Sequence, residues 1–123
     1  LRLPKNALMA KIIIVGGSLG GLFAANILLR QGHDVTLLEK AMGSLDGRGA
    51  GIVTHAALAD ALRQAGVVVD NTLGVAVTQR VTLGSDGKSL GMMELPQILT
   101  SWSRLYHMLK EAFPVERYLQ GKF

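Results

Sequence analysis

The chain contains no cysteine among its 123 residues. This absence excludes a disulfide scaffold, a thiolate metal site and a cysteine nucleophile, and it fits the cytoplasmic location that we expect. Charged residues make up only 18% of the chain, whereas hydrophobic residues make up 49%. This balance is typical of a globular protein, and the length suffices for one modest domain with its own core.

Clusters that would indicate other functions are also missing. The net charge is +4, but the basic residues are scattered and do not alternate with aromatic residues, so we predict no nucleic-acid interface. The three histidines, His33, His55 and His107, are far apart and show no metal-ligand spacing, so we predict no metal site. No serine lies in a nucleophile-elbow pattern, and we assign no catalytic residue.

One stretch without charged residues, 12–29, is of borderline length for a membrane span. Its four glycines, Ser18 and Asn26 dilute its hydrophobicity, and it divides better into a strand, a turn and a helix. No cleavage site of small residues follows a continuous apolar core, as it would in a signal peptide. We therefore predict no membrane segment.

The first 40 residues predict a β-α-β unit with parallel strands. A run of β-branched residues is typical of a strand that is buried on both faces, and a glycine follows the expected helix as its stop. The predicted elements are a strand at 12–15, a turn at 16–21, a helix at 22–31 and a strand at 34–38 that is closed by Glu39.

The remainder of the sequence predicts a small antiparallel hairpin near residues 74–95, between two helices. The elements are a glycine-rich loop at 46–51, a helix at 54–65 with Leu58, Leu62 and Ala65 inward, strands at 75–83 and 90–93 around a turn at 85–88, a helix at 101–113 that buries Trp102, Leu105, Leu109 and Ala112, and the start of a strand at 117–123. We therefore predict an α/β fold: a partial Rossmann-like FAD/NAD(P)-binding fold with a parallel sheet and a small antiparallel hairpin.

The first turn has the composition of a phosphate-binding loop. Dinucleotide binding needs a tight turn, close approach of the backbone to a pyrophosphate and close helix–strand packing, all of which glycine allows. Gly16 fits the turn and Gly21 the helix–strand contact, while Ser18 replaces the usual middle glycine. The candidate phosphate-binding residues are Gly16, Gly17, Ser18, Leu19, Gly20 and Gly21.

Glu39 ends the second predicted strand, 18 residues after Gly21. A carboxylate at this position can accept hydrogen bonds from ribose hydroxyls and would repel a 2′-phosphate, which disfavours NADP. Loop, helix and acid together predict dinucleotide binding. They do not decide between FAD and NAD.

Three motifs resemble FAD-dependent aromatic-ring monooxygenases of the para-hydroxybenzoate hydroxylase family. The resemblance is closest to the 2,6-dihydroxypyridine hydroxylase branch and covers nearly the whole chain from Met9. The motifs are Val15-Gly16-Gly17-Ser18-Leu19-Gly20-Gly21-Leu22 with Glu39-Lys40, Gly47-Arg48-Gly49-Ala50-Gly51-Ile52-Val53, and Thr100-Ser101-Trp102 leading to Leu105, Tyr106 and Leu109.

The resemblance implies that FAD is the cofactor, that NAD(P)H is a transient reductant and that a small aromatic or N-heteroaromatic substrate is hydroxylated. Glu39, next to Lys40, would hold the adenosine ribose. The segment with Arg48, Ala50, Gly51 and Ile52 would pass near the flavin side, although Arg48 could equally face solvent. Trp102 stands where relatives place a cofactor-contacting arginine or glutamine, and we expect it to anchor the core.

The family's later FAD motifs are absent. We therefore expect residues 9–123 to be the N-terminal FAD-binding segment of an incomplete domain, and residues 1–8 to be a leader or vector-derived. Exposed apolar edges predict association with the remainder of its own polypeptide or a homo-oligomer. An NAD-dependent oxidoreductase and a non-catalytic Rossmann-like binding module stay open as alternatives.

Overall fold

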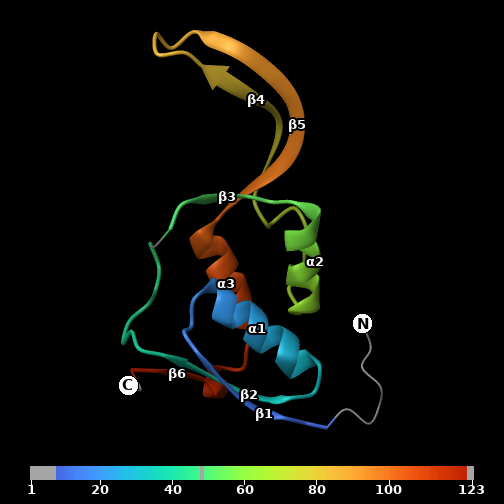
Figure 1. The fold of residues 1–123 in the computed structure, drawn as a ribbon, viewed down its shortest axis with the longest axis vertical. Coiled ribbons are helices and arrows are strands. Elements are labelled where there is room, and N and C mark those ends of the chain that lie inside the picture. Colours follow the sequence, from blue (N-terminus) through green and yellow to red (C-terminus); the bar gives the residue numbers. More distant parts are fainter. Residues whose placement is uncertain (1–7, 48, 122–123) are drawn as a thin grey trace.

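The computed structural model describes residues 8–47 and 49–121, and Figure 1 shows their arrangement. Helix α1 packs on one face of a parallel sheet and α3 packs against α1, and a long antiparallel hairpin extends away from this body. The elements in chain order are β1 (Lys11–Val15), α1 (Leu19–Arg30), β2 (Asp34–Glu39), β3 (Gly51–Val53), α2 (Ala56–Gln64), β4 (Val75–Leu83), β5 (Ser89–Ser101), α3 (Trp102–Ala112), the 3₁₀ turn η1 (Val115–Arg117) and β6 (Tyr118–Gln120).

The parallel sheet has the strand order β1-β2-β6. Ile13 is paired with Thr36, and Leu37 with Tyr118, in parallel register. The predicted β-α-β unit is confirmed, although α1 begins at Leu19, before the predicted start. The strand expected near the C-terminus is β6, which pairs with β2 and gives the sheet its third strand.

The hydrophobic core lies between the three helices and the sheet. One buried polar side chain, Asn26, donates hydrogen bonds to the carbonyl oxygens of Leu22 (3.0 Å) and Leu109 (2.8 Å), so it joins α1 to α3 without an unsatisfied amide donor. The fully buried side chains at the centre include Leu22, Val35, Leu37, Leu62, Leu105, Tyr106 and Leu109.

Two sequence-based expectations about burial were wrong. Strand β1 is not buried on both faces: Ile13 is 62% exposed and Val15 is 72% exposed, because β1 is an edge strand and the helices cover only one face of the described sheet. Ala112 is exposed, and Phe113 is buried in its place. Phe113 follows the buried Leu109 by four residues and is the C-cap of α3, where the backbone becomes extended.

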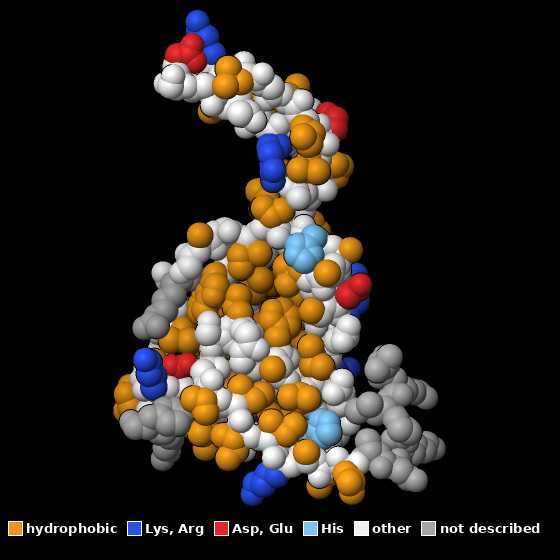
Figure 2. Space-filling model, viewed as in Figure 1, with side chains coloured by type: hydrophobic (Ala, Val, Ile, Leu, Met, Phe, Trp, Pro, Cys, Tyr) orange, Lys and Arg blue, Asp and Glu red, His pale blue; other side chains and the backbone are white. Residues whose placement is uncertain are grey.

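The antiparallel sheet, with the order β3-β5-β4, confirms the predicted hairpin and enlarges it. Strand β5 is much longer than the predicted 90–93, and the short β3 was not predicted. Figure 2 shows apolar side chains along the hairpin of β4 and β5. The large exposed apolar residues of the hairpin strands are Val75, Val81, Leu83, Leu90, Met92, Met93 and Leu99. The self-association expected from such surface stays a prediction.

Within the described residues, no helix combines the length and the apolar character that crossing a membrane requires. The charge-free stretch 12–29 is divided among β1, the loop that follows it and α1. A strand, a turn and a helix therefore account for its hydrophobicity.

An ion pair ties the beginning of β2 to η1. Arg117 Nη1 lies 2.5 Å from Asp34 Oδ1, and this hydrogen bond, with the charges of Arg117 and Lys11, lowers the pKa of Asp34. We expect Asp34→Asn to lower the midpoint of thermal unfolding at neutral pH. Because the pKa is lowered in the folded state, the stabilisation is present above the unfolded pKa, about 4, and is lost as pH falls through the folded value. Melting curves of both proteins should therefore converge in acid, and a pH-independent difference would contradict this role.

Candidate dinucleotide-binding site

The loop between β1 and α1 depends on two glycines. Gly16 has φ +108°, a conformation that L side chains rarely adopt, and its N–H donates to the carbonyl of Leu38 (2.7 Å). A Cβ at Gly21 would overlap the carbonyl oxygen of Gly16. The first glycine therefore allows the turn, and the last one allows α1 to approach the loop closely.

The N-terminus of α1 presents backbone donors at this loop. Ser18 is the N-cap, and its side chain makes no capping hydrogen bond among the described residues. The first helical bond runs from the Leu22 N–H to the Ser18 carbonyl (3.0 Å), so the N–H groups of residues 19–21 have no acceptor inside the helix. With no acidic residue in the first turn, this end of the helix suits an anion such as a pyrophosphate.

Glu39 lies directly beside the loop. Its carboxylate is buried and accepts hydrogen bonds from the N–H groups of Gly17 (2.7 Å) and Ala41 (2.8 Å). A cavity of about 320 Å³ at the carboxyl ends of β1 and β2 is lined by Val15, Gly16, Glu39 and Lys40. The structure thus brings the loop next to Glu39 and Lys40, which are distant from it in the sequence. They meet at the edge of the sheet where α/β proteins bind ligands.

Tyr118 is a residue of this site that sequence reasoning missed. Its hydroxyl donates to the carbonyl oxygen of Gly17 (3.0 Å), and a Cβ at Gly17 would collide with that hydroxyl. Burial, followed by a hydrogen bond with Tyr106, raises the pKa of Tyr118, so the phenol stays protonated. Only the pairing of β6 with β2 places Tyr118 beneath the loop, and no local motif could have shown it.

The second predicted segment lies around β3. The carbonyl of Ala50 accepts the Trp102 N–H (3.1 Å), and Gly51 and Ile52 pair with Ser101 and Thr100 of β5. Gly51 is exposed and Ile52 is half-buried. These contacts join the segment to the beginning of α3. Arg48, which was predicted to contact the cofactor, lies outside the described residues.

Trp102 supports this segment from α3. Its ring stacks on Tyr106, with 5.1 Å between centroids, and Gly49, at φ +86°, packs directly against it. The side chain is half-buried, and it packs against the core as expected for an anchor. Whether it also contacts the cofactor stays a prediction.

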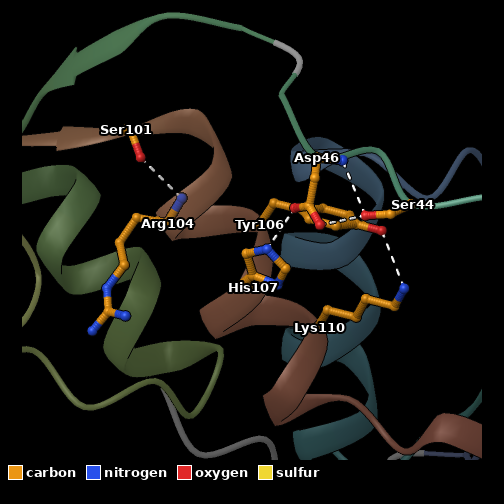
Figure 3. Close-up of polar contacts among 7 residues, drawn as sticks. All are labelled: Ser44, Asp46, Ser101, Arg104, Tyr106, His107 and Lys110. Atoms are coloured by element: carbon orange, nitrogen blue, oxygen red, sulfur yellow. Dashed lines mark hydrogen bonds and ion pairs between the residues drawn. The ribbon is translucent and has the colours of Figure 1, made fainter.

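A polar network holds the middle of the loop between β2 and β3 against α3, as Figure 3 shows. Asp46 accepts a hydrogen bond from Ser44 Oγ (2.6 Å), and His107 Nε2 lies 2.5 Å from its other oxygen. The Ser44 hydrogen bond, then the attraction of His107, lowers the pKa of Asp46. Together with the buried Leu45, this network fixes the course of the loop between the two predicted cofactor segments.

The histidines have structural partners rather than a shared ligand. His55 caps α2 by accepting the Leu58 N–H (3.2 Å), and His33 accepts the Ala10 N–H (3.3 Å). Among the residues that the structure describes, no group of three or more His, Asp or Glu side chains could hold a metal ion.

Comparison with known proteins matches this chain to one protein family and to several similar proteins. A model of the FAD binding domain matches residues 9–108. The chain is 33% identical over 112 residues to 2,6-dihydroxypyridine 3-monooxygenase of Paenarthrobacter nicotinovorans, covering 91% of this chain. The structure of 2,6-dihydroxypyridine-3-hydroxylase from Arthrobacter nicotinovorans superposes over 94% of this chain with a TM-score of 0.81 and 32% identity.

A third protein, 2-methyl-3-hydroxypyridine-5-carboxylic acid oxygenase in a tetrameric form, matches 86% of the chain with a TM-score of 0.73 and 27% identity. The chain spans only 28% of the first relative and 29% of each solved structure. The matched residues include the loop, Glu39 and the β3 segment. The chain therefore belongs to the FAD binding domain family, whose cofactor is FAD.

Proposed function

We propose that this chain forms the N-terminal FAD-binding segment, residues 9–123, of a flavin-dependent monooxygenase that hydroxylates an aromatic or N-heteroaromatic substrate. NAD(P)H and O₂ would be the co-substrates. The observation that carries the proposal is the one-third identity, over nearly the whole chain, to an enzyme named as a dihydroxypyridine monooxygenase. The alternatives, an NAD-dependent oxidoreductase and a non-catalytic module, have no comparable support.

The donors at the first loop fit the ADP half of FAD. The N–H groups at the α1 terminus would bind the pyrophosphate, while Gly16 and Gly21 leave room for its close approach. Glu39 would accept the ribose hydroxyls, and Lys40 lines the same cavity. The proposed residues of this half are Gly16, Gly17, Ser18, Leu19, Gly20, Gly21, Glu39 and Lys40.

Arg48, Ala50, Gly51 and Ile52 would pass the flavin half of the cofactor. When bound, FAD supplies the redox and oxygen chemistry, and the protein supplies orientation and shielding from water. This chain would hold the cofactor between the N-terminus of α1 and the β3 segment. Helix α3 packs against α1, contacts the β3 segment and holds the loop that carries Asp46. The substrate class and any homo-oligomer, such as the tetramer of the pyridine-carboxylate oxygenase, also remain proposals for the whole protein.

Titration of the 123-residue chain with FAD tests the proposal directly. We expect flavin fluorescence to be quenched and the absorbance bands of FAD to shift on binding, because the cofactor leaves water for a protein site. In a parallel titration NAD should bind more weakly. A chain that binds NAD more tightly than FAD, or that binds neither, would overturn the proposed function.

A further inference from the structure

One face of α3 connects the two proposed cofactor segments. Trp102, Tyr106 and Lys110 follow each other at intervals of four residues, so they lie along the same side of the helix. Trp102 contacts Gly49 near the β3 segment, and the ammonium of Lys110 lies 3.3 Å from the hydroxyl of Tyr106. Figure 3 shows Lys110 extending from α3 toward Tyr106, beside the loop that carries Ser44.

Lys110 also lies close to the phosphate loop. Its ammonium is 4.9 Å from the centroid of the Tyr118 ring, and the Tyr118 hydroxyl donates to the carbonyl of Gly17. Lys110 is therefore linked through Tyr118 to the loop that precedes α1, where the free backbone N–H groups lie. Its charge also helps to lower the pKa of Asp46, after the larger effects of Ser44 and His107, so the cation acts on the neighbouring loop too.

Asp46 is a carboxylate on which the charge of Lys110 acts. Asp46 is already engaged by Ser44 and His107. Lys110 is half-buried, and a cation that is partly removed from water attracts an incoming anion more strongly than an exposed one does. The described residues form ion pairs between Arg63 and Asp60, Lys88 and Asp86, His107 and Asp46, and Arg117 and Asp34.

We propose that Lys110 is a further cofactor-binding residue, whose ammonium provides countercharge to the pyrophosphate of FAD between the Gly17 loop and the Ser44–Asp46 turn. This inference rests on the proposed function. Sequence reasoning could not find it, because Lys110 belongs to none of the three motifs and was one of many scattered basic residues. The ammonium contacts Tyr106 and Tyr118, and Tyr118 in turn contacts Gly17, an arrangement that exists only in the folded chain.

The experiment compares FAD affinity in the 123-residue chain and its Lys110→Gln and Lys110→Arg variants at several salt concentrations. We expect Lys110→Gln to weaken FAD binding about 5- to 50-fold at low salt and to reduce the salt dependence of the affinity. Lys110→Arg keeps the charge and should retain most of the affinity. Lys88→Gln removes a lysine from the exposed hairpin turn and should have no effect, which makes it the matched control.

The outcomes separate the two proposals. Unchanged affinity in Lys110→Gln, or an equal loss in Lys110→Arg with an unaltered salt dependence, would overturn the countercharge role while leaving FAD binding intact. Failure of the unmodified chain to bind FAD would instead overturn the proposed function, and this inference with it. If Lys110→Gln does not fold, as judged by circular dichroism, Lys110→Met tests the same loss of charge with an apolar side chain of similar length.

Discussion

Replacing Gly21 with valine is expected to abolish FAD binding and to lower the free energy of unfolding by about 1–3 kcal/mol. A side chain at this position would overlap the carbonyl oxygen of Gly16, so the loop and the start of α1 would have to separate. That separation would move the backbone N–H groups away from the pyrophosphate position. FAD titration measures the first effect, and urea unfolding measures the second.

Gly20→Ala is the matched control for the effect of this substitution on stability. Gly20 lies one residue earlier in α1, and a Cβ there would meet no described atom within 4 Å. Alanine is also a better helix former than glycine, by about 1 kcal/mol, so stability should be unchanged or slightly higher. Equal losses of stability in the two variants would show that close packing at Gly21 is not the cause.

Glu39→Gln is expected to weaken FAD binding about 10- to 100-fold and to lower the free energy of unfolding by about 1–3 kcal/mol. The two carboxylate oxygens of Glu39 accept the N–H groups of Gly17 and Ala41. Glutamine has one carbonyl oxygen, so its amide NH₂ would face one of these donors. The substitution also removes the charge that the ribose hydroxyls would contact.

Glu111→Gln removes a carboxylate from an exposed position on α3 and serves as the control. Isothermal titration with FAD, beside urea unfolding of the same samples, compares the two variants. A Glu39→Gln protein with normal FAD affinity would show that this side chain only supports the loop and does not contact the cofactor. Weaker binding with unchanged stability would show that the side chain contacts the cofactor and does not support the loop.

The local elements were largely predictable because their signals lie within short windows. The β-branched run, the glycine turn and the position of Glu39 predicted the β-α-β unit, and the alternation at 75–83 predicted the hairpin. The burial of individual side chains was harder to predict. Ile13 and Val15 were predicted to be buried, but their exposure depends on which elements cover the sheet, and the described helices cover only one of its faces.

The amino-acid sequence alone determined the dinucleotide-binding character of this protein and its family resemblance, because glycine spacing and the strand-end acid are local requirements of phosphate and ribose binding. Only the tertiary structure decided that Tyr118 lies beneath Gly17, that His107 holds Asp46 and that the Lys110 ammonium lies over the ring of Tyr118. The first two of these contacts join residues that are 101 and 61 positions apart in the chain. They arise when α3 packs on α1 and β6 pairs with β2, and no local pattern encodes such long-range packing.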